Sequence, residues 1–237
     1  VQAMKLNKKV VSKGIWLSIV LTIWLRLLLF VTGYNIASRL HPIPLVTTGM
    51  DFVENIPTDA SDAWYYIVQP LHRYDALWYE EIAHNQYVDQ PLTTSFYPLF
   101  PYLTNIVSNF FQISFDVSAF FITTIFTFLT FFLLYLLSCL EFDGNIGIRT
   151  LLVFATFPTV FFLLAPYAES LLFTFILLAL ILAKKNKIVL STLVAILATL
   201  TKPYGVAVVL PLGFIFLMSK PFKEKIINSL ILLTIPI

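Results

Sequence analysis

Three polar residues stand beside turns of an otherwise apolar chain, and their types suit chemistry at a phosphate. Asp75 lies in a polar segment, 72–84, while Glu169 and Lys202 each stand beside a proline turn. A carboxylate can take the proton of an attacking hydroxyl, and a lysine ammonium near a lipid surface is a natural partner for a phosphate. We therefore take Asp75 as the candidate catalytic base, Lys202 as a candidate phosphate ligand and Glu169 as a candidate substrate ligand.

Asp75, placed on a helix at about 100° per residue, shares one face with aromatic and apolar residues. These are Trp78, Tyr79, Ile82 and Ala83, and the other face has Arg73, Leu77, Glu80, Glu81 and His84. A carboxylate on the aromatic, membrane-leaning face is poorly hydrated, which suits a base. The alternative is that Asp75 caps the start of the helix, although Trp78 stands where a glutamate would complete a capping box.

Glu169 and Lys202 each have a simpler explanation. Glu169 could be a favourable first-turn acid of the helix that follows it, and Lys202 could extend its stem to the interface. An ionisable group costs about 2.5–3.5 kcal/mol at mid-membrane and less near the interface. Because both residues are expected on the same side of the membrane as Asp75, their joint placement favours a shared site.

Further candidates surround these three. Arg26 lies deep in the first apolar run, so it must face the bundle, a partner or a lipid phosphate. Its alternative is a structural pair with a buried acid. Arg73 is another candidate phosphate ligand. The candidate ligands for sugar or prenyl surface are Tyr167, Trp78, Tyr79 and His84.

Several signals of other functions are absent from the sequence. The histidines, His41, His72 and His84, show no metal-ligand spacing, and the single cysteine, Cys139, is interpreted as a packing residue. The sequence contains no phosphate-binding loop, no GxGxxG and no GxSxG elbow, so we do not expect soluble nucleotide hydrolysis. We expect no metal or other cofactor, with the alternative that acidic residues alone recruit a metal. The net charge is +2 with lysines in short, separated clusters, which leaves no basic stripe for a nucleic acid.

The elements that must position these residues are membrane helices. Hydrophobic residues make up 59% of the chain and charged residues 12%, about half the charge of a soluble domain, and the mean hydropathy is +0.86. A helical span needs about 20 apolar residues. The expected spans are 15–33, 117–140, 149–166, 168–183, 188–201, 203–219 and 226–237. The predicted fold is all-α, a polytopic transmembrane bundle in one domain, 1–237, and the apolar C-terminal run suggests a fragment of a longer bundle.

Lysine clusters set the expected orientation, because cytoplasmic loops are rich in lysine and arginine. With the clusters inside, the long loop 34–116 and both proline turns face outward. Within this loop, 97–113 predicts an amphipathic helix lying in the interface. Its polar face would be Thr104, Asn105, Ser108 and Asn109, and its apolar face Leu103, Ile106, Val107 and Phe110. The alternative, a true span over 97–113, would place the lysines of 184–187 outside.

Three ordered motifs carry a resemblance to a known family. The first is Arg73-Tyr74-Asp75-Ala76-x-Trp78-Tyr79-x-x-Ile82-Ala83, followed by Tyr87 and by Phe96-Tyr97-Pro98-Leu99-Phe100-Pro101. The second is Phe157-Pro158-Thr159-x-Phe161-Phe162-x-x-Ala165-Pro166-Tyr167-x-Glu169-Ser170, and the third is Ala198-x-x-Thr201-Lys202-Pro203-x-Gly205. Together they resemble the GPI mannosyltransferase 2 family and its prokaryotic relatives, which belong to the GT-C glycosyltransferases. Lys202 stands where relatives usually have arginine, Tyr74 where they have tryptophan and Gln86 where they have glycine.

The resemblance implies a GT-C-like fold and an inverting transfer of a mannosyl or related residue from a polyprenyl-phosphate-sugar donor to a lipid-linked or glycan acceptor at the outer or luminal face. It implies a base in the first outer loop, which maps onto Asp75, and basic residues on the lipid phosphate. Two other classes remain open, a polytopic transporter and a non-catalytic subunit of a membrane glycosylation complex. We expect an integral, multi-pass protein, in the cell membrane if prokaryotic and in the endoplasmic reticulum membrane if eukaryotic.

Overall fold

The structure, a computed structural model, describes residues 7–39, 71–87, 91–219 and 234–235, and the regular elements in these ranges are all helical. This confirms the predicted all-α fold for the described part of the chain. In chain order the elements are α1 (Lys8–Arg39), α3 (Asp75–Asn85), η1 (Pro91–Ser95), α4 (Leu99–Phe111), α5 (Phe115–Glu141), α6 (Gly144–Ala155), η2 (Pro158–Val160), α7 (Phe161–Leu164), α8 (Glu169–Lys184), α9 (Ile188–Thr199), η3 (Pro203–Val208) and α10 (Val209–Ser219).

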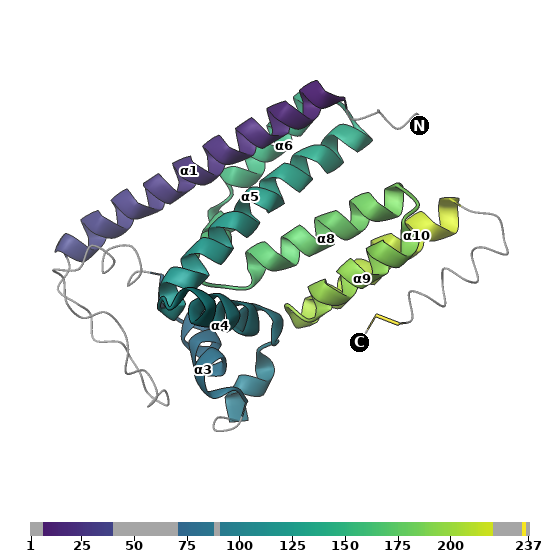
Figure 1. Cartoon of the computed structure of the whole chain (residues 1–237). Helices are drawn as coiled ribbons and strands as arrows, with labels where there is room; N and C mark the ends of the chain where they lie inside the picture. Colours follow the sequence, from purple (N-terminus) through teal and green to yellow (C-terminus); the bar gives the residue numbers. More distant parts are fainter. Residues whose placement is uncertain (1–6, 40–70, 88–90, 220–233, 236–237) are drawn as a thin grey trace.

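The helix α5 is the centre of the bundle. It packs against α1, α6 and α8, and α8 packs in turn against α9 (Figure 1). The close approach of α1 to α5 depends on Gly14, because a Cβ at this position would lie 2.6 Å from a ring carbon of Tyr135. The shorter helices α3 and α4 gather at one end of the long helices, beside the start of α8 (Figure 1).

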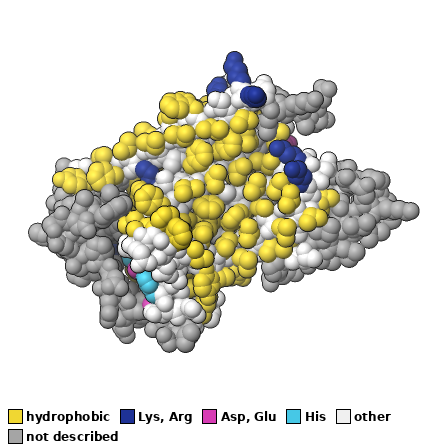
Figure 2. All heavy atoms as spheres, viewed as in Figure 1, with side chains coloured by type: hydrophobic (Ala, Val, Ile, Leu, Met, Phe, Trp, Pro, Cys, Tyr) yellow, Lys and Arg dark blue, Asp and Glu magenta, His cyan; other side chains and the backbone are white. Residues whose placement is uncertain are grey.

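Two of the described helices are long and apolar enough to cross a membrane. They are Lys8–Asn35 and Phe115–Glu141, and a third crossing results if the bent pair Gly144–Ala155 and Pro158–Leu164 is one span. Figure 2 shows a broad hydrophobic surface over the middle of the long helices, with lysine and arginine side chains gathered mainly at one end. Large apolar side chains such as Trp16, Val153 and Leu210 are exposed, as expected for a protein surface in contact with lipid.

The predicted span 149–166 is wrong as a single straight helix. α6 ends at Ala155, and the chain bends by 77° before η2 and α7. Pro158 explains the break, because a residue before proline avoids the helical region and Phe157 is extended, with φ −72° and ψ 133°. The expected span 226–237 lies almost entirely outside the described residues, as does much of the loop 34–116.

The helix α4 covers most of 97–113, and its length argues against a crossing. Its 13 residues rise about 20 Å, against an apolar thickness of about 30 Å. Ile106 and Phe110 are exposed, which fits an apolar face turned to lipid. The predicted polar face is wrong at Thr104, which is buried and donates a hydrogen bond to the Phe100 carbonyl.

The two ends of α8 differ in chemistry. The helix begins at Glu169 and ends at Lys184, a rise of about 24 Å. Lys184 pairs with Glu141 at the last turn of α5. The lysine end of α8 therefore lies away from the end at which α3 and α4 gather.

Candidate functional site

The structure brings Asp75, Glu169 and Lys202 together at the start of α8. The Lys202 Nζ lies 2.5 Å from Glu169 Oε1 and 3.3 Å from Asp75 Oδ2. The side chains of Lys202, Glu169 and Asp75 are 10%, 17% and 38% exposed, respectively. One ammonium therefore serves two carboxylates, and Asp75 is both the more exposed and the more loosely held of the two.

Asp75 is the first residue of α3, and its carboxylate does not cap the helix. The N-cap position belongs to Tyr74, which has φ 53° and makes no side-chain capping bond. The capping alternative is therefore wrong. A bulky residue with positive φ is an outlier, and such backbone strain clusters at functional sites. The turn leaves the Asp75 carboxylate free to face Lys202.

The helical-face prediction around Asp75 is only partly correct. Trp78, Tyr79, Ile82 and Ala83 are buried, but they pack inside the protein and not against the membrane, and Leu77 and Glu81 are buried too. The expected poor hydration of Asp75 is wrong, because its side chain is 38% exposed. Glu81 is compensated by Asn85, whose amide donates to both of its carboxylate oxygens at 3.2 Å. The helix α3 is thus enclosed on more than the one face that its sequence pattern indicates.

Glu169 occupies the first turn of α8, as the simpler explanation required, and it also binds Lys202. The two explanations are therefore compatible. Its second carboxylate oxygen, Oε2, is buried and has no hydrogen-bond partner among the described residues. A buried acceptor usually has a partner, so this oxygen is suited to a donor brought by a ligand.

Lys202 lies in the turn between α9 and η3. Its ammonium points inward to the two carboxylates, so the alternative of a side chain extended to the interface is wrong. Burial opposes the charge on Lys202, but Glu169 and Asp75 outweigh this effect, so that the pKa of the ammonium lies above its usual value. Lys202 is therefore charged at neutral pH.

The turn around Lys202 is fixed by close backbone contacts. The Gly205 N–H donates to the Lys202 carbonyl at 2.9 Å, and a Cβ on Gly205 would lie 2.2 Å from the Ala198 carbonyl oxygen. Only glycine allows η3 to approach α9 so closely. The Leu99 N–H donates to the Leu200 carbonyl at 3.0 Å, which ties the start of α4 to the same turn.

The candidate aromatic ligands are largely packed inside the protein. Tyr79 is 1% exposed and lies edge-on to the rings of Phe96 and Phe100. Trp78 is stacked on Phe96 with ring centroids 5.8 Å apart. Burial raises the pKa of Tyr79, followed by the effect of the nearby carboxylates of Glu169 and Asp75. Stacking of Trp78 or Tyr79 on a sugar stays a prediction.

Tyr167 joins two of the three motifs. Its hydroxyl donates to the Arg73 carbonyl at 2.9 Å, and its ring is stacked on Phe162. Burial, followed by the charges of Asp75 and Glu169, raises the pKa of Tyr167. The second motif therefore holds the backbone just before Asp75.

Arg26 and His84 lie apart from the Lys202 cluster. Arg26 donates to the carbonyls of Leu164 and Phe120 and to the Thr123 hydroxyl. The alternative, a structural pair of Arg26 with a buried acid, is therefore wrong, because its hydrogen-bond acceptors among the described residues are carbonyl and hydroxyl oxygens. His84 is about half exposed, and its Nε2 lies 3.8 Å from Glu80 Oε1. The Arg73 side chain is partly buried.

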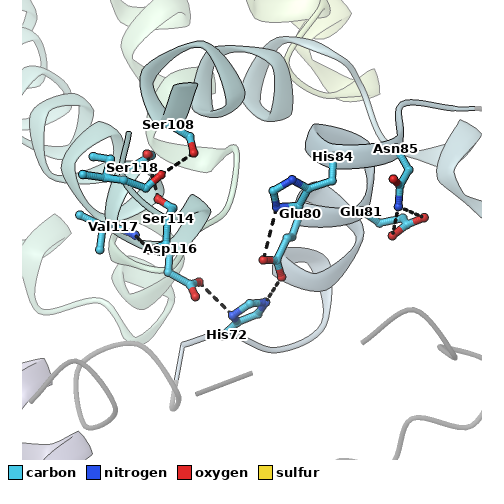
Figure 3. A network of polar contacts seen from close by, with 11 residues as sticks. His72, Glu80, Glu81, His84, Asn85, Ser108, Ser114, Asp116, Val117 and Ser118 are labelled. Atoms are coloured by element: carbon cyan, nitrogen blue, oxygen red, sulfur yellow. Dashed lines mark hydrogen bonds and ion pairs between the residues drawn. The ribbon is translucent and has the colours of Figure 1, made fainter. Parts of the chain in front are cut away.

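A buried histidine cluster was not predicted from the sequence. His72 is fully buried, with Nδ1 2.9 Å from Asp116 Oδ1 and Nε2 2.9 Å from Glu80 Oε2 (Figure 3). Burial alone would lower the pKa of His72, but Asp116 and Glu80 outweigh it and raise the pKa to about 9. The imidazolium thus joins the segment that leads into α3, the middle of α3 and the start of α5. The partner Asp116 lies far along the chain, so residue spacing gives no signal for this contact.

Comparisons with protein-family models, with curated proteins and with solved structures find no match for this chain. The resemblance to the GPI mannosyltransferase 2 family accordingly rests on the motif residues alone. The three motifs meet in space, since they supply Asp75, Glu169 and Lys202 respectively. Among the described residues, no group of three or more His, Cys, Asp or Glu side chains is arranged to hold a metal.

Proposed function

We propose that this chain is an integral, multi-pass membrane glycosyltransferase with a GT-C-like fold. It moves a mannosyl or related residue from a polyprenyl-phosphate-sugar donor to a lipid-linked or glycan acceptor, with inversion. The observation that carries the proposal is the convergence of Asp75, Glu169 and Lys202 from three distant motifs. The site lies at the end of the helices opposite to the lysine end of α8, which supports an outer or luminal location.

Asp75 is assigned the role of base rather than Glu169. Asp75 is 38% exposed and 3.3 Å from the ammonium, whereas Glu169 is 17% exposed and 2.5 Å from it. The more accessible and less tightly paired carboxylate is better placed to receive a proton from an entering acceptor. Glu169, with its unpartnered Oε2, is assigned to a hydroxyl of the sugar or of the acceptor.

The reaction balances without a further reactant. Asp75 takes the proton of the acceptor hydroxyl, the oxygen attacks the anomeric carbon from the face opposite the phosphate, and the carbon–oxygen bond to the phosphate breaks. The phosphate leaves with the electron pair, so the negative charge that develops on it must be stabilised. Lys202 is the buried cation at this place.

The charge of the site's own side chains constrains how an anionic donor binds. Two carboxylates and one ammonium leave one negative charge, which opposes a phosphate. Lys202 must therefore shift its contact from a carboxylate to the phosphate, and a second cation is needed. Arg73, in the same motif as Asp75, is our candidate for this second cation.

The donor's prenyl chain has an apolar place to lie. A cavity of about 310 Å³ lies between α1 and α5, and its mostly apolar lining includes Ile23, Phe30, Leu71 and Phe120 together with the charged Arg26. Leu71 precedes the His72–Asp75 segment, which connects this cavity to the polar site along the chain.

The decisive experiment compares two aspartate variants of the whole protein. Membranes from cells that produce it receive radiolabelled polyprenyl-phosphate-mannose, and transfer to lipid or glycan is measured. Asp75→Asn should abolish transfer at unchanged protein level. Asp143→Asn is the matched control, because Asp143 caps α6 and asparagine caps equally well. Full transfer by Asp75→Asn would favour a non-catalytic subunit, and donor uptake into vesicles without transfer would favour a transporter.

A further inference from the structure

The break between α7 and α8 frees backbone carbonyls in an apolar environment. The helix α7 ends at Leu164, Ala165 is extended, and the Tyr167 N–H, which a continuing helix would direct to Leu163, donates to the Ala165 carbonyl at 2.7 Å instead. The carbonyls of Leu163 and Leu164 therefore lack the donors that a continuing helix would supply. Both residues are buried, and an unpaired backbone group is strongly disfavoured at membrane depth.

Two neighbouring helices supply the missing donors. The Thr127 hydroxyl of α5 donates to the Leu163 carbonyl at 2.7 Å. The Arg26 Nη1 of α1 donates to the Leu164 carbonyl at 2.7 Å, and its Nη2 donates to the Thr123 hydroxyl at 2.8 Å. The guanidinium thus joins α1, α5 and the end of α7 at one point.

The segment held in this way leads directly into the candidate site. Ala165 and Ala168 are fully buried, and Glu169 then begins α8. The Tyr167 hydroxyl in the same turn donates to the Arg73 carbonyl. The position of the end of α7 therefore affects Glu169 along the chain and the Arg73–Asp75 segment through Tyr167.

We propose that Arg26 is a positioning residue for the candidate site and not a ligand of the donor phosphate. Each Nη atom donates to a backbone or hydroxyl acceptor, and the Nε is buried without a partner among the described residues, while Arg26 also lines the cavity between α1 and α5. Thr127, one helical turn after Thr123 on α5, has the same positioning role, because its hydroxyl donates to the Leu163 carbonyl. This inference rests on the proposed function of Glu169 and Asp75, and it replaces the phosphate-binding role first considered for Arg26.

A distance measurement tests the positioning independently of activity. Spin labels are placed at Thr159→Cys in η2 and Ile125→Cys in α5, which are both exposed, in the whole protein with Cys139→Ala. Arg26→Met and Thr127→Val should each broaden or shift the electron–electron distance distribution, and Arg26→Lys should largely restore it. Arg149→Met and Thr32→Val are matched controls at exposed positions, and they should leave the distribution unchanged. An unchanged distribution in Arg26→Met would overturn the inference.

Kinetics separate positioning from phosphate binding. Misplacement of a reacting group by about 1 Å can cost about 100-fold in rate, so Arg26→Met should lower kcat by about that factor while the donor KM stays within about threefold. Thr127→Val should act in the same direction. A donor KM raised at least tenfold in Arg26→Met, with Thr127→Val unaffected, would instead make Arg26 a phosphate ligand. If the unmodified protein transfers no sugar, the proposed function fails, and the distance measurement still decides whether Arg26 holds the segment.

Discussion

Lys202 lies closer to Glu169 than to Asp75, at 2.5 Å against 3.3 Å, although it contacts both. This asymmetry gives different environments to two carboxylates for which the sequence already indicates different candidate roles. The more tightly paired Glu169 is suited to hold the lysine and a ligand hydroxyl, and the looser Asp75 is suited to accept a proton. The relationship leads to a prediction for the lysine itself.

Two replacements of Lys202, one that removes its positive charge and one that keeps it, should differ in their effects on stability and transfer. Lys202→Met leaves two carboxylates close together without a cation, and loss of one partner of a buried ion pair costs about 3–5 kcal/mol. The midpoint of thermal unfolding of the detergent-solubilised protein should fall, and transfer should be lost. Lys202→Arg keeps the charge and should keep both folding and measurable transfer. Equal stability of Lys202→Met and the unmodified protein would contradict the ion-pair geometry.

The buried imidazolium of His72 predicts a loss of stability at alkaline pH. Its pKa is raised to about 9, so the stabilisation is fully present below the unfolded pKa of about 6.5 and is lost as the pH rises through about 9. The shift corresponds to at most about 3–4 kcal/mol. The midpoint temperature of thermal unfolding should decrease as the pH is raised from about 6.5 to about 9.5. His72→Gln should remove most of this pH dependence.

The matched control for His72 is His84, which is about half exposed and 3.8 Å from Glu80. His84→Gln should retain the pH dependence of the unmodified protein. If His72→Gln and His84→Gln weaken the dependence equally, the assignment to His72 is wrong.

The two glycines Gly205 and Gly144 should respond differently to an added methyl group. At Gly205 a Cβ would lie 2.2 Å from the Ala198 carbonyl oxygen, whereas at Gly144 the nearest atom would be 3.9 Å away. Overpacking typically costs about 1–3 kcal/mol, and at Gly205 it also displaces Lys202. Gly205→Ala should therefore lower both the unfolding midpoint and transfer, while Gly144→Ala should lower neither.

The proposed orientation places Tyr74 and Lys187 on opposite sides of the membrane. Tyr74 is 77% exposed beside Asp75, and Lys187 follows the lysine end of α8. In a Cys139→Ala background, a membrane-impermeant thiol reagent should label Tyr74→Cys in intact cells and Lys187→Cys only after permeabilisation. Labelling of both from one side would overturn the topology and the outer location of the site.

Much of the architecture could be predicted because membrane helices and proline turns leave strong local signals. The long spans of α1 and α5 follow from apolar length, and the joint placement of Glu169 and Lys202 with Asp75 followed from charges beside proline turns. Other features depend on tertiary contacts. Glu81 is buried because Asn85 accompanies it, and Thr104 is buried despite its place in a polar stripe.

Hydrogen-bond partners distant in sequence were the main features that could not be predicted. His72 forms an ion pair with Asp116, and Arg26 donates a hydrogen bond to the Leu164 carbonyl. Neither pair has a characteristic spacing, and each depends on where a helix breaks or how a loop returns to the bundle. The chemical type of a residue indicated that it needed a partner, whereas only the fold shows which partner it has.

The hydrogen bond from the Leu99 N–H to the Leu200 carbonyl joins the start of α4 to the turn that carries Lys202. α4 presents Ile106 and Phe110 to the exterior, so its depth should follow the lipid, and any vertical shift is passed to the turn that carries Lys202. Bilayer thickness would then act as a regulator of turnover. In vesicles of single-chain-length phosphatidylcholine, transfer should vary with acyl length, and Ile106→Ser together with Phe110→Ser should flatten that response.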